Sequence, residues 1–366
     1  MATSVADVLA KRLAAGSSGA VRGWVRSVRR HKRFSFVQVG DGSSWDSLQA
    51  VVATEQLPAS LTTGSSVRVA GKVAEGRDGA VELAADEVEL VGECDQASYP
   101  LQKKYHSPEF LREIMHLRPR SNRFAAVLRA RSTAALALNN FFDEQGFVQV
   151  NTPILTSTDC EGAGEMFRVR DPFEENRDRF LTVSGQLHAE MFATALSKVY
   201  TFGPTFRAEN SNTARHLCEF YMIEPEVAFH TLEDSMDLAE QSVKTALRSV
   251  FERRAADVGH LFSDDAATEA SATGHSVAQR LADATKAMES EWVRMTYDEA
   301  VDTLTRSGKE FAHPVKWGLA LQSEHERYLS EELCGRTPVF VTHYPRACKA
   351  FYMKRVPARP DTVACF

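Results

Sequence analysis

The chain has 366 residues, 43% of them hydrophobic and 25% charged, with a formal net charge of −6. This length can hold two domains with a sizeable core, and the negative charge means that contact with nucleic acid requires a local basic patch. The six cysteines form no CxxC pair, so we expect reduced thiols. No apolar run approaches twenty residues, so we expect no membrane partner. A cytoplasmic location is expected, with an organellar location still open.

Five short segments near the N-terminus predict a small β-barrel. They carry alternating or β-branched apolar residues separated by Gly and Asp: VRGWVRSVRR (21–30), FSFVQVGDG (34–42), SLQAVVA (47–53), SVRVAGKVAEG (66–76) and AVELAADEVELVG (80–92). Five strands without an intervening helix favour an OB-type barrel, a fold that often binds nucleic acid. We expect residues 1–92 to form this domain and residues 93–119 to form a linker or hinge.

A basic stretch lies in the first hairpin of this barrel. Between Val21 and Arg33 the sequence has six Lys or Arg residues, one His and no acid, and Phe34 and Phe36 follow. Cations can hold phosphates while unstacked bases lie on aromatic rings, as a single-stranded nucleic acid requires. The alternative is a solvated basic edge with both phenylalanines in the barrel core, and this segment alone slightly favours that alternative.

A helix and then several strands are predicted next. SNRFAAVLRARSTAALALNNFFDEQG (121–146) has apolar residues near helical spacing, and Gly146 is the expected C-cap. Those apolar residues are Phe124, Val127, Leu128, Ala135, Leu138 and Phe142. Strand-like segments predominate from FVQV (147–150) through EFYMIEPEVAF (219–229).

The last of these strands has two different faces. Alternation places Phe220, Met222, Glu224 and Glu226 on one face, and the other is a predicted core face with Tyr221, Ile223, Val227 and Phe229. Arg207 and Glu209 project together from the preceding segment. The arginine can hold a phosphate, the carboxylates can bind an amine and the ring can stack on a base. These residues therefore suit a nucleotide plus an amine. The alternative, a network of surface salt bridges, explains the aromatic placement less well.

The C-terminal part reads mainly as helical. Residues 231–292 predict a helical insertion: an acidic amphipathic helix at 231–254, then a loosely structured, Ala- and Ser-rich stretch at 263–276. Thr296 and Glu299 have the capping-box spacing. QSEHERYLSEELCG (322–335) predicts another helix, and TPVFVTHYP (337–345) and KAFYMKR (349–355) predict strands.

Several segments of the sequence resemble the motifs of one known enzyme family. GPTFRAENSNTARHLCEFYMIEPE (203–226) resembles motif 2 of the class II aminoacyl-tRNA synthetases in its asparaginyl form, and GFVQVNTPIL (146–155) is similar to motif 1. Three further segments match the asparaginyl enzymes in order: GWVRSVRRHKRFSFVQV (23–39) in the OB domain, then DCEGAGEMF (159–167) and VSGQLHAEMFATALSKVYTFGPTFRAEN (183–210). The resemblance implies an α+β protein in which the five-stranded OB-type barrel precedes a catalytic domain (120–366), an antiparallel class II sheet flanked by helices.

The resemblance also implies an asparagine–tRNA ligase that uses ATP and Mg²⁺, binds asparagine and tRNA(Asn), and forms a homodimer through motif 1. Arg207 is the implied catalytic residue, holding the α-phosphate and the amino acid carboxylate. The implied ATP-binding residues are Arg207, Ala208, Glu209, Arg215, His216, Leu217 and Phe220, with Phe220 stacked on adenine. The implied amino-acid-binding residues are Glu161, Gln186, Glu190 and Glu224, and the implied anticodon-binding residues are Arg29, Phe36 and Gln49.

Asparagine rather than aspartate is the expected amino acid. The aspartyl relatives place a lysine where this chain has Ala189, and here Glu190 is adjacent. A neutral amide can donate an N–H to a carboxylate, whereas a second carboxylate would be repelled. Glu190 could also be a solvent-facing helix charge, and that alternative stays open.

The family's motif 3 is not found before the chain stops at DTVACF (361–366). Motif 3 carries an arginine that grips the distal phosphates, and an acidic Mg²⁺ ligand normally lies just before it. We therefore identify no metal ligand, expect the active-site sheet to be incomplete at its C-terminal end, and expect no independent catalysis. The alternative function is a catalytically inactive tRNA-binding or dimerising module.

Overall fold

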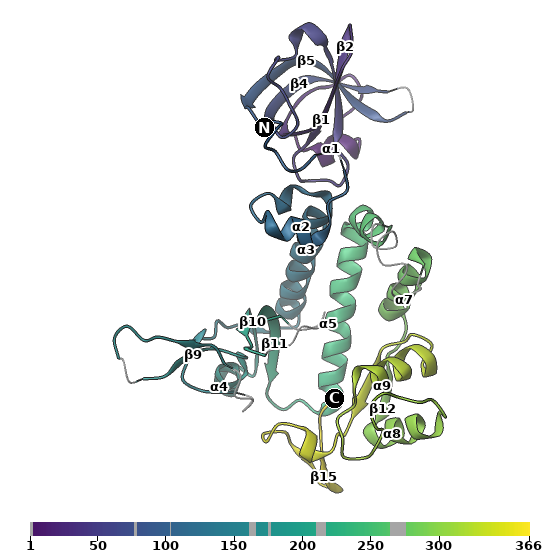
Figure 1. Cartoon of the computed structure of the whole chain (residues 1–366). Helices are drawn as coiled ribbons and strands as arrows, with labels where there is room; N and C mark the ends of the chain where they lie inside the picture. Colours follow the sequence, from purple (N-terminus) through teal and green to yellow (C-terminus); the bar gives the residue numbers. More distant parts are fainter. Residues whose placement is uncertain are drawn as a thin grey trace. The chain divides into compact units, whose positions relative to one another are not determined.

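The computed structural model describes residues 3–76, 79–102, 104–160, 166–174, 177–209, 217–263 and 276–366 (Figure 1). Its contacts divide the chain into two units. Unit 1 comprises residues 1–133 and 250–277, and unit 2 comprises residues 134–249 and 278–366. No helix in the described part of the chain combines the length and hydropathy needed to span a bilayer.

Unit 1 contains the predicted barrel, and the five-stranded prediction is confirmed. The strands are β1 (Ser18–Arg30), β2 (Phe34–Gly40), β3 (Leu48–Ala53), β4 (Ser66–Glu75) and β5 (Val81–Gly92). They close in the order β1-β2-β3-β5-β4, with β3 and β5 parallel and the other pairs antiparallel. The short helices α1 (Val5–Leu9) and η1 (Thr54–Gln56) complete the barrel, and Val5 and Val8 of α1 are buried in its core.

Alternation along β2 decides which side chains fill this core. Val37 and Val39 point inward and are fully buried, whereas Phe34 is 54% exposed and Phe36 is half-buried on the opposite face. The alternative that both phenylalanines belong to the barrel core is therefore wrong. Their rings face outward, where a ligand can reach them.

The segment that follows the barrel contains two short helices, α2 (Pro108–Glu113) and η2 (Arg118–Arg120), and leads into α3 (Asn122–Glu144). Gly146 has φ +78°, which agrees with the predicted C-cap. The apolar stripe of α3 is buried only in part. Phe142 lies in the core, but Val127 and Leu128 are exposed.

The central sheet of unit 2 has the order β11-β10-β6. Its strands are β6 (Val148–Gln149), β10 (Lys198–Phe206) and β11 (Glu219–Val227), and α4 (Gln186–Leu196) packs on β10 and β11. One face covers an aromatic core of Phe141, Phe142, Phe147 and Tyr200, with Ile223 and Val227 beside it. A small second sheet has the order β7-β9-β8, with strands β7 (Leu155–Thr156), β8 (Arg168–Val169) and β9 (Arg179–Leu181).

The predicted core face of β11 is wrong at two positions. Tyr221 is 53% exposed and contacts Phe202 edge-on, with ring centroids 6.0 Å apart. Phe229 is 97% exposed and has φ +70°. It lies beyond the end of the strand at Val227, so strand alternation no longer determines where its side chain points.

The predicted insertion begins with α5 (Leu232–Arg253), continues in helical residues 255–263 and ends with α7 (Val277–Glu289). Most of the predicted loose stretch, residues 264–275, lies outside the described residues. In unit 1, Asp257 accepts two hydrogen bonds from Arg129, at 2.9 Å from Nε and 2.5 Å from Nη2. Arg129 Nη1 also donates to the Gly42 carbonyl at 2.6 Å, which ties this segment to the β2–β3 loop.

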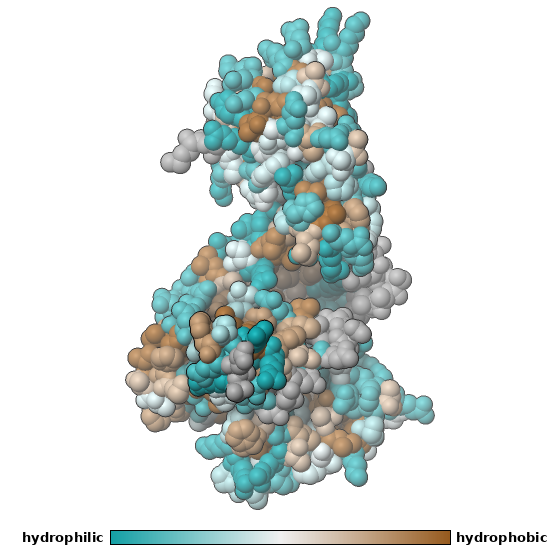
Figure 2. All heavy atoms as spheres, turned by 60° about the vertical axis from the view of Figure 1, so that its left-hand side comes forward, coloured by the Kyte–Doolittle hydropathy of each residue, from teal (hydrophilic) through white to brown (hydrophobic). Residues whose placement is uncertain are grey.

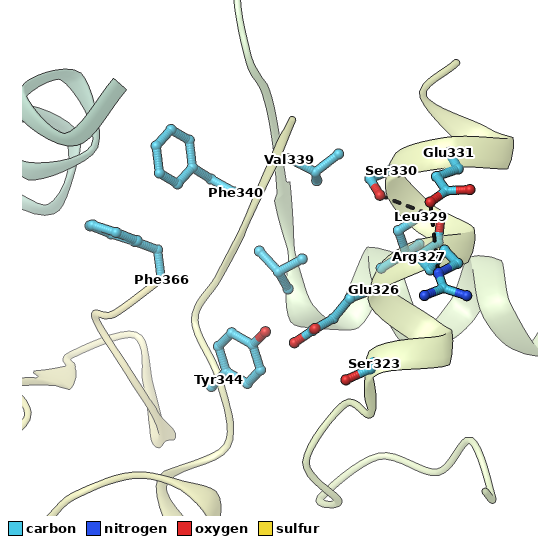
Figure 3. Close-up of a pocket in the computed structure, with 11 residues that line it drawn as sticks. Ser323, Glu326, Arg327, Leu329, Ser330, Glu331, Val339, Phe340, Tyr344 and Phe366 are labelled. Carbon is cyan, nitrogen blue, oxygen red and sulfur yellow. Dashed lines mark hydrogen bonds and ion pairs between the residues drawn. The ribbon is translucent and has the colours of Figure 1, made fainter. Parts of the chain in front are cut away.

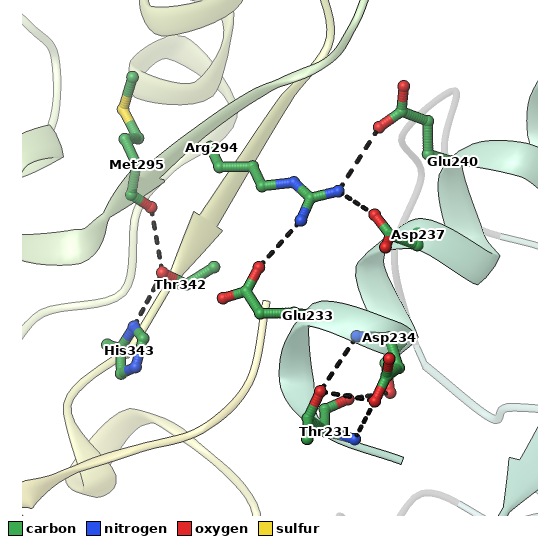
Figure 4. Close-up of polar contacts among 10 residues, drawn as sticks. Thr231, Glu233, Asp234, Asp237, Glu240, Arg294, Met295, Thr342 and His343 are labelled. Atoms are coloured by element: carbon green, nitrogen blue, oxygen red, sulfur yellow. Dashed lines mark hydrogen bonds and ion pairs between the residues drawn. The ribbon is translucent and has the colours of Figure 1, made fainter.

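In unit 2, Arg294 of β12 (Val293–Thr296) joins that strand to α5 (Figure 4). Its guanidinium faces three carboxylates of the helix, with Glu233 at 2.9 Å, Asp237, and Glu240 at 3.9 Å. The hydrogen bond to Asp237 is the main cause that raises the pKa of Arg294. β12 pairs in parallel with β13 (Val339–Thr342), where Thr342 Oγ1 donates to the Met295 carbonyl at 3.3 Å.

The remaining elements are α8 (Tyr297–Arg306), α9 (Ser323–Arg327), the π-helical turn η3 (Tyr328–Leu333), η4 (Arg346–Cys348), β14 (Arg355–Val356) and β15 (Arg359–Val363). The capping box of Thr296 and Glu299 is confirmed at the start of α8. The predicted strand at 349–355 is wrong, since only Arg355 is in a strand and Phe351 lies in an exposed turn.

The buried Arg129–Asp257 pair generates a stability prediction. Both side chains are largely buried, 12% and 7% exposed, so Asp257→Ala leaves an uncompensated guanidinium. We expect a loss of about 3 kcal/mol in the free energy of unfolding of unit 1, measured by urea titration. The control Glu87→Ala removes a mainly exposed partner of Arg68 and should cost under about 1 kcal/mol. Equal small losses in both variants would contradict this account.

Candidate active site on β10 and β11

The antiparallel register of β10 and β11 assembles one polar face. Thr205 lies opposite Phe220 and Thr201 lies opposite Glu224. The ladder continues beyond β10, because the Arg207 N–H donates to the Cys218 carbonyl at 3.0 Å. Since side chains alternate along each strand, Arg207 shares this face with all four of those residues.

Arg207 and Phe220, predicted to hold the α-phosphate and adenine, lie together on this face. The guanidinium carbon of Arg207 is 5.6 Å from the centroid of the Phe220 ring. Arg207 Nη2 is 4.0 Å from the sulfur of Met222. A cation beside an aromatic ring can hold a phosphate next to a stacked base.

Glu224 is the buried carboxylate of the site, with 9% of its surface exposed. The Ser184 hydroxyl donates to its Oε1, and the Gly185 N–H donates to both carboxylate oxygens at 3.2 and 3.1 Å. A Cβ at position 185 would lie 2.6 Å from Thr152 Oγ1 and 3.2 Å from Glu224 Oε2. The close approach of this backbone therefore requires glycine.

Gln186 and Glu190 lie on the first turns of α4. Gln186 Nε2 donates to Glu190 Oε1 at 2.8 Å, and Glu190 is exposed. Ala189 between them is fully buried against Val150 and Val199. The position where aspartyl relatives place a lysine therefore lies in the packing between α4 and the sheet.

Glu226 is a site residue that the sequence reasoning left out, although alternation already placed it on the same face as Glu224. Burial is the main cause that raises its pKa to about 8, and the negative charges of Glu190 and Glu224 add to this effect. Three carboxylates therefore influence one another at this end of the face. Ser184, Thr152 and Thr201 were also missed, because only the folded backbone brings the Ser184 hydroxyl to Glu224 and the Thr152 hydroxyl to that of Thr201.

A cavity of about 190 Å³ opens beside these groups. Its lining is mainly small or polar and includes Thr152, Thr201, Thr205, Gly185 and Glu224. Glu161, Arg215 and His216 lie outside the described residues, while Ala208 and Glu209 are half-buried directly after Arg207 and Leu217 is exposed.

The three predicted anticodon-binding residues lie on one outer face of the barrel. Arg29 pairs with Phe36 across β1 and β2, with its guanidinium carbon 5.8 Å from the ring centroid. Gln49 accepts a hydrogen bond at 2.9 Å from Gln38, which the sequence reasoning did not select, and donates to Glu82 at 2.5 Å. Amide groups fixed beside a ring can read the edges of an unstacked base.

A larger cavity of about 420 Å³ in unit 2 contains none of the predicted site residues (Figure 3). It lies between the α9–η3 segment and β13, and the side chains of Glu326 and Tyr344 point into it. Burial raises the pKa of Tyr344 to about 12, with smaller contributions from Glu326 and Cys365. Cavity size alone therefore does not locate the site that the sequence predicts.

Comparison with known proteins agrees with this architecture. The family model for class II tRNA synthetases (D, K and N) matches residues 107–365, and the model for the OB-fold nucleic acid binding domain matches residues 20–91. The crystal structure of asparaginyl-tRNA synthetase from Pyrococcus horikoshii complexed with asparaginyl-adenylate has a TM-score of 0.83 and 29% identity, covering 100% of this chain and 79% of that chain. The fold and the site thus define a class II tRNA synthetase.

The relatives that are similar in sequence define the family more narrowly than the fold does. Asparagine–tRNA ligase from Hahella chejuensis is 48% identical over 378 residues, covering 96% of this chain and 78% of the relative. The ligase of the same name from Desulfotalea psychrophila is 48% identical over 345 residues, covering 91% and 74%. The chain therefore belongs to the asparagine–tRNA ligase family of aminoacyl-tRNA ligases.

The raised pKa of Glu226 generates a pH prediction. Between pH 4.5 and about 8 the folded state keeps a proton on Glu226 that the unfolded state has lost, so stability falls as pH rises through this window. From pH 6 to pH 9 the loss should be on the order of 2 kcal/mol, and Glu226→Gln should lack it.

Urea unfolding at both pH values measures the difference. Glu219→Gln is the matched control, because Glu219 is exposed on the opposite face of the same strand. An identical pH dependence in wild type and Glu226→Gln would mean that Glu226 is ionised at neutral pH.

Proposed function

We propose that the β10–β11 face binds ATP and asparagine and forms asparaginyl-adenylate. The asparagine carboxylate attacks the α-phosphorus, the bond to the β-phosphate oxygen breaks and pyrophosphate leaves. Arg207 neutralises the α-phosphate and orients the carboxylate, while Phe220 stacks on adenine. A hydroxyl of the terminal tRNA ribose then attacks the acyl carbon and AMP leaves. The observation that carries this proposal is the shared face of Arg207, Phe220 and Glu224.

The carboxylates support a preference for asparagine over aspartate. The carboxyl groups of Glu190 and Glu224 lie at one end of the face beside Glu226, which keeps its proton up to a pKa of about 8, and Ala189 supplies no compensating cation. The ammonium group of the substrate is attracted there, and a neutral side-chain amide can donate to a carboxylate. A second carboxylate would be repelled at close range. Gln186 and Glu161 are further proposed contacts of the amino acid.

The rest of the ATP site is proposed from motif position. Ala208, Glu209, Arg215, His216 and Leu217, which follow Arg207 in the sequence, are the further proposed contacts of ATP. Mg²⁺ is the proposed metal, and it would offset phosphate charge when bound. Within the described ranges no three His, Cys, Asp or Glu side chains converge to hold a metal. We therefore assign it no ligand and no step.

The barrel is proposed to bind the anticodon of tRNA(Asn) through Arg29, Phe36 and Gln49. Their common outer face and the basic β1 strand support this. We propose the domain limits 1–92 for this barrel, 93–119 for the hinge and 120–366 for the catalytic domain with its insertion at about 231–292.

A homodimer through motif 1 and a cytoplasmic location are further parts of the proposal. Four hydrophobic residues of unit 2 in or near motif 1 are exposed: Leu136, Val148, Ile154 and Leu155. Figure 2 shows exposed hydrophobic residues in brown among hydrophilic ones on the face that it draws. A partner copy would bury such residues. None of the six cysteines forms a disulfide, which suits a reducing compartment.

Glu224→Gln tests the amino acid site. The substitution keeps the shape of the side chain but removes the negative charge, so binding of a non-hydrolysable asparaginyl-adenylate analogue should weaken about 100-fold, while ATP binding changes by less than about threefold. Isothermal titration calorimetry measures both ligands. Glu219→Gln on the exposed face is the control and should leave both affinities unchanged. Loss of ATP and analogue binding to the same extent would place Glu224 outside the amino acid site.

A further inference from the structure

A cavity in unit 1 has a strongly basic lining. It measures about 470 Å³ and lies between β1 and residues 101–122, which run from the hinge into the start of α3. Four basic side chains line it, Arg26, Lys104, His106 and Arg120, and the lining contains no carboxylate. This concentration of positive charge occurs in a chain whose net charge is −6. We call these residues the hinge pocket.

Two features of the barrel aim Arg26 into the hinge pocket. The register between β1 and β2 shifts between Val25 and Ser27, so Arg26 has no partner residue on β2. Such a shift redirects a side chain that would otherwise alternate with its neighbours. Gly40 leaves the room that this direction needs, because a Cβ there would lie 3.0 Å from Arg26 Nε.

Arg26 is half-buried and donates to the Arg120 carbonyl. Burial lowers its pKa, Tyr99 acts in the opposite direction, and the positive charges of Arg120 and Arg129 add to the lowering. Arg120 lies with its guanidinium carbon 5.2 Å from the ring centroid of Trp24. Within the described ranges, no carboxylate lies at ion-pair distance from Arg26, Lys104 or Arg120.

This arrangement costs free energy in the absence of an anion. The like charges of Arg26 and Arg120 are held together around a partly desolvated guanidinium, and within the described ranges no carboxylate lies at ion-pair distance from either residue. A phosphate group would accept hydrogen bonds from Arg26 and Arg120 and pair with the Lys104 ammonium. A set of cations fully in solvent would not require the register shift and the glycine that position Arg26.

We propose that the hinge pocket binds a backbone phosphate of the tRNA, outside the base-reading face of Arg29, Phe36 and Gln49. Arg26 and Arg29 are three residues apart on β1, roughly 10 Å along the strand, so one RNA chain can reach both places. The inference rests on the proposed tRNA binding of the barrel. The pocket contact carries no sequence information, because phosphates are the same in every tRNA.

The test compares the full chain with the double variant Lys104→Ala/Arg120→Ala, leaving Arg26 in place because it belongs to the barrel strand. Affinity for tRNA(Asn) should fall about tenfold, equally for a tRNA(Asn) transcript with an altered anticodon. The slope of log affinity against log salt concentration should decrease by about 1. Arg120→Lys should retain most of the affinity, and the thermal midpoint should stay unchanged.

Two controls separate this inference from its alternatives. Lys72→Ala removes an exposed lysine of β4 outside the pocket, and an equal loss there would reduce the effect to general charge and overturn the proposal. Phe36→Ala should abolish discrimination between the two transcripts without changing the salt slope. If Phe36→Ala has no effect while the double variant behaves as expected, anticodon reading fails and the phosphate contact stands.

Inorganic phosphate distinguishes the source of the ligand. Titration into the wild-type chain should change tryptophan fluorescence through Trp24, which contacts Arg120, and Trp24→Phe should remove the change. Phosphate should also compete with tRNA for the wild-type chain and not for the double variant. If phosphate binds but the double variant keeps full tRNA affinity, the pocket takes a small phosphate compound and the tRNA assignment is overturned.

Discussion

The antiparallel pairing of β10 with β11 is the constraint on which the site depends. Its register runs from Lys198 opposite Val227 to Phe206 opposite Glu219 without a shift. One face of this ladder closes over the aromatic core, and the other collects the arginine, the ring and the carboxylates. A one-residue slip would exchange the two faces and bury the charges in the core. The hydrophobic packing of Tyr200 and Ile223 therefore positions Arg207 and Glu224.

Placing carboxylates on a half-buried face costs desolvation free energy, and the structure limits this cost in two ways. The carboxyl group of Glu224 is satisfied by protein donors, since Ser184 and the Gly185 backbone both donate hydrogen bonds to it. Among the described residues no such set of donors is found at Glu226, which keeps its proton up to a pKa of about 8. A bound ammonium group would favour ionisation of Glu226, so the charge needed for the substrate is completed only when the substrate is present.

The sequence predicts the barrel and the polar face of β11 well, because alternation is a local property of each strand. Glu224 follows from it directly, whereas for Phe36 alternation shows only that it shares a face with Phe34, and the sequence slightly favoured the core for that face. The Ser184–Glu224 hydrogen bond and the redirected Arg26 could not be predicted, since they depend on how separate segments meet. The predicted strand at 349–355 is wrong for a related reason. Aromatic residues favour strands when they fit a half-buried sheet surface, and exposed Phe351 packs on no sheet.

The central claim is that the carboxylate-rich face of unit 2 selects a neutral amide. Calorimetric titration of the wild-type chain with matched non-hydrolysable asparaginyl- and aspartyl-adenylate analogues tests it most directly, because the two ligands differ only in the side-chain amide and carboxylate. The account predicts that the asparaginyl analogue binds at least about 100-fold more tightly at pH 7.5, from the loss of a charge-assisted hydrogen bond and the added repulsion. Equal affinities for the two analogues, or tighter binding of the aspartyl analogue, would contradict it.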